Sequence, residues 1–166
     1  MFKFIILFLP AILFSSSLDI KDFKSSFTQT ITTPKNKISK YSGKIKFLNG
    51  SMKWEYLKPY KKEICSKENQ MLIVNHDLEQ VSLLNSPKKI NILKVLNSAK
   101  HHHKNIYTVK MFGSLYTISV TKKKLDYITF YDNLDNKVLI RFTNVKFDKI
   151  NNMLCNYPEY YDFIED

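Results

Sequence analysis

Arginine is almost absent from this basic sequence. Arg141 is the only arginine among 26 basic residues, so lysine carries nearly all of the formal net charge of +11. Nucleic-acid-binding proteins depend on arginine for bidentate contacts with bases and phosphates. We therefore expect no nucleic-acid partner and place the lysines on solvated strand faces. A weak attraction to anionic membranes or acidic partners is the alternative.

Cysteine is also scarce, and catalytic motifs are missing. The two cysteines, Cys65 and Cys155, form no Cys-x-x-Cys motif, which argues against thioredoxin-like chemistry. They could pair in an oxidising compartment, and the sequence leaves this pairing open. No Gly-x-Ser-x-Gly motif is present, so a hydrolase of that type is excluded. We expect neither an enzyme nor a bound cofactor.

No apolar run is long enough to cross a bilayer. Residues 4–14 form an uncharged run of eleven residues, about half the length of a membrane span. Lys3 precedes the run and three serines, 15–17, follow it, which is the order of a cleavable secretory signal. We therefore predict that residues 1–17 are a signal peptide. Residues 18–166 would then form one periplasmic domain.

Two polar clusters suggest metal binding at first sight. Three adjacent histidines, 101–103, cannot all face one ion from a regular element, so we expect a solvated run, with a weak adventitious metal site as the alternative. Asp126, Asp132 and Asp135 lack the spacing of a calcium loop and are better explained as turn formers. We predict no metal site.

Alternation of apolar and polar residues with period two dominates the chain. Segments 43–48 and 51–56 alternate on either side of Asn49-Gly50, a strong signal for a two-residue hairpin turn. In all, the pattern predicts about ten antiparallel strands, at 25–33, 43–48, 51–56, 62–66, 71–74, 80–84, 107–111, 116–121, 125–131 and 137–147, with 71–74 as a central strand. Helical periodicity appears at 88–100, and a short helix is expected at 18–24.

Strands of this kind have one apolar face, and a curved sheet of ten needs cover for that face. Only two helices are available, so the sheet is expected to be open and partly covered by the middle helix. Aromatic residues are abundant on the apolar faces. A concavity that they fill incompletely would be a binding site for an apolar ligand.

Four short segments resemble a known family. Phe23–Gln29 matches a Phe-x-x-x-Phe-x-Gln opening strand, and Gly43–Phe47 with Trp54-x-Tyr56-x-x-Pro59 matches a characteristic hairpin. Residues 158–164 resemble its closing strand, Pro…Asp-Val-Ile. In this order and spacing, the segments are similar to those of the periplasmic outer-membrane lipoprotein carrier proteins.

The resemblance implies a fold and a function. The fold would be mainly β: an unclosed antiparallel β-barrel of about ten to eleven strands with a helical lid over an apolar cavity. Such carriers accept acylated lipoproteins from an inner-membrane ABC-type transporter and deliver them to an outer-membrane acceptor. We expect this chain to act as a monomer. The family's arginine linked to lid opening is replaced by Leu48, followed by Asn49, and its turn glycine by Asn69. How release works is therefore left open.

The apolar cavity yields a set of candidate lipid-binding residues. They are Phe27, Ile45, Phe47, Met52, Trp54, Tyr56, Leu72, Val74, Leu93, Leu96, Tyr116, Ile118, Phe130, Ile140 and Phe142. The alternative function is a lipid-binding or partner-binding sensor domain of similar half-barrel shape. The presence of a single domain favours the carrier.

Overall fold

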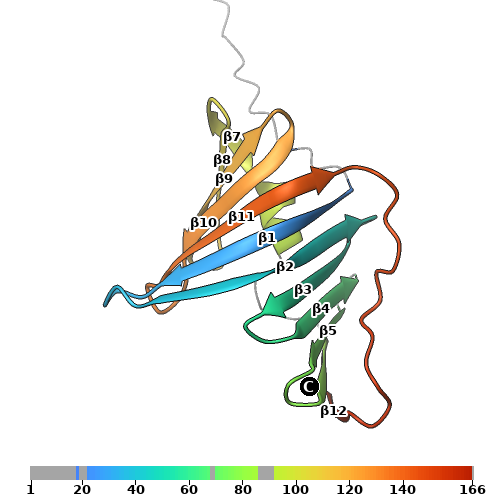
Figure 1. Cartoon of the computed structure of the whole chain (residues 1–166). Coiled ribbons are helices and arrows are strands. Elements are labelled where there is room, and N and C mark those ends of the chain that lie inside the picture. The colour runs from blue at the N-terminus through green and yellow to red at the C-terminus, as the bar shows by residue number, and fades with distance from the viewer. Residues whose placement is uncertain (1–17, 19–21, 68–69, 86–91, 166) are drawn as a thin grey trace, which may run out of the picture.

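The computed structural model describes residues 18, 22–67, 70–85 and 92–165, and in this part of the chain all strands join one sheet (Figure 1). The strands are β1 (Phe23–Thr32), β2 (Ile38–Leu48), β3 (Ser51–Lys58), β4 (Lys62–Lys67), β5 (Gln70–Asn75), β6 (Gln80–Asn85), β7 (Lys100–His103), β8 (Ile106–Met111), β9 (Ser114–Thr121), β10 (Lys124–Tyr131), β11 (Lys137–Lys146) and β12 (Asp162–Glu165). Their order is β12-β6-β5-β4-β3-β2-β1-β11-β10-β9-β8-β7. The sheet is open, as expected, with twelve strands rather than ten or eleven.

The predicted hairpin of β2 and β3 is confirmed. Asn49 and Gly50 both have positive φ, at 48° and 76°, which is the conformation that a two-residue hairpin turn needs. The register pairs Ile45 with Trp54 and Phe47 with Met52, so the apolar residues of both strands share one face. We call this the inner face of the sheet.

The core lies between the inner face and helix α1 (Ile92–Ser98), which is visible behind the strands in Figure 1. Ile92, Val95 and Leu96 are buried against the sheet, followed by Ala99 after the helix. The expected middle helix is therefore confirmed, although shorter than 88–100, and residues 86–91 lie outside the described part. The N–H of Leu18 donates to the carbonyl of Ala99 at 3.1 Å, which ties the start of the described fold to the end of α1.

Two expectations about secondary structure are corrected. The short helix at 18–24 does not extend over its last residues, because Phe23 and Lys24 already pair with β2, while 19–21 lie outside the described part. The sheet is not wholly antiparallel either, because β12 runs parallel to β6.

A long C-terminal segment crosses the outer face of the sheet. Residues 147–161 leave β11 and run across the strands to β12 (Figure 1). We call these residues the strap. The strap explains why 71–74 is apolar on both faces without being central: β5 is third from the edge, and its outer face is covered by the strap. The part of the chain that is described holds no helix long and apolar enough to cross a membrane.

Candidate functional site

A cavity of about 510 Å³ lies on the inner face. Its wall is formed by Gln29, Met52, Trp54, Tyr56, Lys62, Ile64, Met71, Ile73, Ile92, Phe112, Phe130, Asn133 and Ile140. Most of these side chains are apolar, and the volume falls within the roughly 300–1,000 Å³ of small-molecule sites. The sheet therefore retains an unfilled apolar space beside a packed core.

The register of the strands determines which side chains form the wall. Ile45 on β2 pairs with Trp54 on β3, Trp54 pairs with Ile64 on β4, and Ile64 pairs with Ile73 on β5. Residues opposite each other in antiparallel strands point to the same face. One side chain from each strand therefore forms a continuous apolar row, with Ile45 buried beneath the cavity and the other three exposed to it.

Aromatic rings fix the shape of the wall. The ring of Phe27 meets Trp54 edge to face at a centroid distance of 4.8 Å, and it meets Tyr56 in the same way at 5.3 Å. Trp54 and Tyr56 are stacked at 6.1 Å. Phe27 packs closely because Gly43 lies opposite it on β2, where a β-carbon would approach the Phe27 ring to 2.9 Å.

The aromatic residues of the wall also carry two polar groups. The hydroxyl of Tyr56 donates to Oε1 of Gln29 at 2.9 Å, and burial, with a smaller contribution from Tyr41, raises the pKa of Tyr56, so this hydroxyl stays protonated. The indole Nε1 of Trp54 is buried and has no hydrogen-bond partner among the described residues. A buried donor without a partner is costly, and such groups mark places where a ligand atom can accept the bond.

The structure divides the predicted lipid-binding residues into three groups. Met52, Trp54, Tyr56, Phe130 and Ile140 line the cavity. A second group lies in the adjoining core: Phe27, Ile45, Phe47, Leu96, Tyr116, Ile118 and Phe142. Leu72 and Val74 are separated from both groups, and the side chain of Leu93 lies outside the described part. Sequence reasoning missed Ile64, Met71 and Ile73, of which Ile64 follows a charged neighbour, Glu63, whereas Met71 and Ile73 lie in a continuous apolar run.

Leu72 and Val74 face the strap instead of the cavity. Leu72 pairs with Cys65, and Val74 pairs with Glu63, and both partners are held by the strap on the outer face. Met71, rather than Leu72, lines the cavity. In an apolar tetrapeptide, either alternate set can face inward, so the pattern alone could not determine the register.

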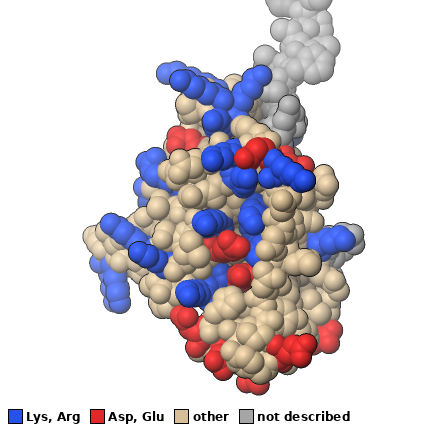
Figure 2. All heavy atoms as spheres, turned by 45° about the vertical axis from the view of Figure 1, so that its right-hand side comes forward, with Lys and Arg blue, Asp and Glu red and all other residues tan. Residues whose placement is uncertain are grey.

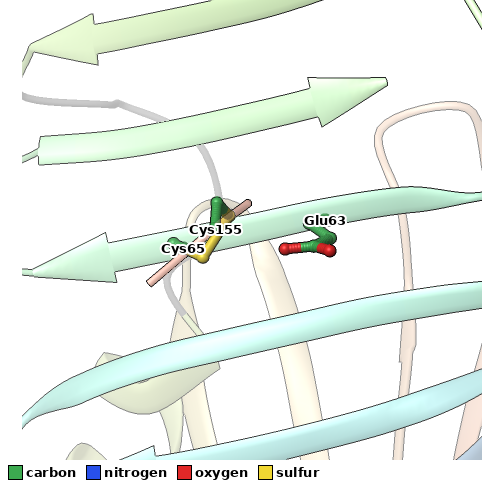
Figure 3. Close-up of side chains that lie close together, drawn as sticks. All are labelled: Glu63, Cys65 and Cys155. Carbon is green, nitrogen blue, oxygen red and sulfur yellow. A yellow bond between two sulfur atoms is a disulfide. The ribbon is translucent and has the colours of Figure 1, made fainter. Parts of the chain in front are cut away.

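A disulfide attaches the strap to the sheet. Cys65 on β4 and Cys155 in the strap are bonded, which settles the pairing that the sequence left open (Figure 3). Glu63 lies beside them, and its Oε2 accepts a hydrogen bond from the backbone N–H of Asn156 at 3.2 Å. Glu63 and the two sulfur atoms are close enough to hold a metal ion, but the sulfurs are engaged with each other in the disulfide.

Lysines on the same row of the sheet hold the rest of the strap. Lys24 pairs with Lys46, Lys46 with Lys53, and Lys53 with Cys65 across adjacent strands. Each ammonium donates to strap carbonyls, namely those of Lys149, of Asn151 and Asn152, and of Leu154. One transverse row of the outer face therefore contacts the strap at successive points.

Lys53 is the most deeply buried of these lysines. Its side chain is 1% exposed and lies 3.2 Å from Glu55 and 3.0 Å from Glu63. A third contact, at 2.6 Å, reaches the carbonyl of Leu154. Two carboxylates and a carbonyl thus satisfy an ammonium that would otherwise be costly to bury.

The charges on the face of the strap are unevenly distributed. In Figure 2, lysines occupy the upper and left-hand parts, while acidic residues gather at the lower end, where β12 lies in Figure 1.

The histidines of β7 are exposed, and Nε2 of His101 lies 2.9 Å from the carbonyl of Lys104. Asp132 forms a turn, as expected, by accepting hydrogen bonds from the backbone N–H groups of Leu134 and Asn136.

Comparisons with known proteins agree with this architecture. A family model described as outer membrane lipoprotein carrier protein LolA matches residues 19–126. An outer-membrane lipoprotein carrier protein of Campylobacter jejuni is 32% identical over 155 residues, covering 92% of this chain and 91% of the relative. That of Helicobacter hepaticus is 29% identical over 136 residues, covering 81% of this chain and 76% of the relative.

Similarity of fold extends to distant sequences. The crystal structure of an uncharacterized conserved protein from Thermus thermophilus superimposes with a TM-score of 0.57 at 10% identity. The match covers 88% of this chain and 91% of the other. At this identity the likeness concerns the fold alone.

Proposed function

Because this chain belongs to the LolA family of outer membrane lipoprotein carrier proteins, we propose that it shields the acyl chains of lipoproteins in its cavity and carries them through the periplasm from the inner to the outer membrane. The family is one of carriers rather than enzymes. The family model and the two relatives support a lipoprotein as cargo. The acyl site and the direction of transport are the proposal.

The apolar cavity beside the packed core is the observation that carries the proposal. Each methylene moved from water into such a cavity contributes about 0.8 kcal/mol. A chain of some fifteen methylenes would gain roughly 12 kcal/mol if fully covered. A cavity that covers only part of a chain reduces this gain, which suits a carrier that must also release its cargo.

Trp54 gives the cavity a second property. Acyl chains of lipids are joined through ester or amide groups, whose carbonyl oxygens accept hydrogen bonds. Trp54 lines the cavity, while its Nε1 is covered and has no partner among the described residues, so a shift of the indole on binding would offer this donor to one such carbonyl. The cavity would then recognise an acyl group, with its carbonyl, rather than any hydrocarbon.

The partners of the cycle follow from the same proposal. The chain would be cleaved after residue 17, exported, and loaded as a monomer by an inner-membrane ABC-type transporter. An outer-membrane acceptor would take the cargo. Leu48 ends β2 at its turn, where the family has its arginine, so release would depend on contacts other than that arginine.

Displacement of an apolar fluorescent dye from the mature protein tests the proposal. We expect an acylated lipopeptide to displace the dye and the same peptide without acyl groups to leave it bound. Ile73→Phe, which fills part of the cavity, should lower lipopeptide affinity by tenfold or more. The matched control is Leu78→Phe, at an exposed site away from the cavity wall.

Two outcomes would contradict the carrier function. Equal displacement by both peptides would mean that the polypeptide is recognised, as in a partner-binding sensor. Full lipopeptide affinity in Ile73→Phe would place the acyl site elsewhere. In cells, depletion should leave lipoproteins in the inner membrane, whereas a sensor domain would leave their distribution unchanged.

A further inference from the structure

Exposed apolar side chains gather at one end of the sheet. The connections β1–β2, β3–β4, β5–β6, β8–β9 and β10–β11 all lie at this end, as the antiparallel pairing requires. Of the fourteen exposed large hydrophobic side chains in the described residues, eight lie at or next to these connections. The other six lie in the strap and β12. Phe147, the first residue of the strap, directly follows the end of β11 at the opposite end of the sheet.

Five of these eight side chains lie on strands that are near neighbours in the sheet. We define the apolar rim as Ile38, Phe112, Leu115, Tyr131 and Leu134, which are 58%, 38%, 59%, 58% and 76% exposed. They belong to β2, β9, β10 and the loops beside them, within the continuous order β2-β1-β11-β10-β9-β8. The hairpin of β1 and β2 and the β10–β11 loop project together from the sheet (Figure 1).

The apolar rim borders the cavity. Phe112 lines the cavity and is also partly exposed, so its ring contacts both the cavity and the solvent. Asn133, next to Leu134, lines the cavity as well. An acyl chain entering along Phe112 would therefore pass directly from the surface of the rim into the binding site.

Leu134 is held outward by its own loop. Oδ1 of Asp132 accepts hydrogen bonds from the N–H groups of Leu134 at 2.9 Å and Asn136 at 3.0 Å, and Oδ2 accepts one from Nδ2 of Asn136. These bonds outweigh burial and lower the pKa of Asp132, so the carboxylate stays charged and the loop stays fixed. The loop thus presents an exposed leucine without having to order it on contact.

Lysines flank the apolar rim. Lys35, Lys37 and Lys40 lie on the β1–β2 hairpin, Lys137 pairs with Thr32 beside it, and Lys110 pairs with Leu115. Two aspartates lie nearby, and one of them, Asp132, is occupied by its own loop. The surroundings of the rim are therefore net positive.

We propose that the apolar rim docks on the interface of an anionic lipid bilayer, which places the cavity against the membrane from which acyl chains leave. Single apolar side chains on projecting loops, surrounded by lysines, match the two parts of such an interface: an apolar boundary layer and negatively charged headgroups. A surface that binds a protein partner would instead present one continuous, closely packed apolar patch. The inference rests on the proposed carrier function and identifies the membrane surface to which the carrier binds.

Flotation with lipid vesicles tests this docking. The mature protein is mixed with vesicles of phosphatidylcholine containing 30% phosphatidylglycerol, or with pure phosphatidylcholine. We expect co-flotation with the first and little with the second. The double variant Ile38→Ser/Leu134→Ser should lower the partition coefficient by about tenfold or more, and Lys35→Ser/Lys37→Ser should do so in low salt.

A matched control separates the rim from apolar surface in general. Leu154 and Tyr160 in the strap are 77% and 70% exposed, and their replacement by serine should leave flotation within twofold of the wild type. The proposal is overturned if the wild type does not float with anionic vesicles, or if Ile38→Ser/Leu134→Ser floats as the wild type does. Dye displacement by lipopeptide in the same preparations reports on the carrier function independently, since neither Ile38 nor Leu134 lines the cavity.

Discussion

The two faces of this sheet are stabilised in different ways. The inner face is held by apolar packing around α1 and leaves a cavity, and its contacts have little directional character. The outer face over β1 to β5 is held by a disulfide, a buried lysine and hydrogen bonds to the strap, each with a fixed partner. The same strands thus have an inner face whose packing can vary and an outer face whose contacts each need one particular partner.

This difference suits a carrier. A binding cavity that must accept flexible chains gains from side chains that repack at low cost, which apolar contacts allow. An open sheet with such a cavity lacks the closure that would stabilise a barrel. The strap supplies stability on the face opposite the cavity, so the inner face is free to remain incompletely packed.

The largest effect is expected from the disulfide. Cys65 and Cys155 are 90 residues apart, and a cross-link over such a loop stabilises a protein by roughly 4–5 kcal/mol in the chain-entropy treatment. Cys65→Ser/Cys155→Ser should therefore lower the free energy of unfolding, measured by urea denaturation, by several kcal/mol. Lipopeptide affinity below the transition should not change. A loss below 1 kcal/mol, or a parallel loss of affinity, would show that the two faces are not independent.

A somewhat smaller effect is expected from Lys53. Replacing it with methionine removes the ammonium that Glu55 and Glu63 share, although Glu63 keeps His76 as a neighbour, and breaking such a pair costs about 3 kcal/mol when the carboxylates are mostly buried. Lys24→Met is the control, because the ion pair of Lys24 with Asp148 is exposed and screened by solvent, so its loss should shift the urea midpoint far less. Urea midpoints of the two variants give the comparison. Equal midpoints would mean that the burial of Lys53 contributes nothing to the strength of its pairs.

Sequence reasoning predicted the inner face better than the outer face, and the reason is physical. Alternation with Asn49-Gly50 between strands determined the β2–β3 hairpin, and with it the position of Trp54 in the cavity wall. Apolar periodicity is a local signal that one strand carries by itself. The same periodicity predicted the open sheet with the middle helix over its apolar face, and the family resemblance agreed with it.

The strap could not be predicted in this way. Its contacts join residues about 100 positions apart, such as Lys53 with Leu154, and no local pattern marks such a pair. Leu72 was placed on the wrong face for the same reason, because the strap buries outward-facing residues that periodicity treats as solvent-exposed. Predicting the outer face required a long-range contact between the strap and the sheet, which local secondary-structure propensities do not reveal.

The smallest and most selective effect is expected at Trp54, where in the proposed function a single atom would distinguish an acyl group from a hydrocarbon. Trp54→Phe keeps an aromatic ring in the cavity wall but removes Nε1, the buried donor without a partner. A hydrogen bond of this kind contributes about 1 kcal/mol, or roughly a fivefold change in affinity. Isothermal titration with an ester-linked lipopeptide should show this loss, whereas binding of a pure hydrocarbon dye should change by less than twofold. If both ligands weaken equally, Trp54 acts through its area alone, and the inner face then contains no specific contact with its cargo.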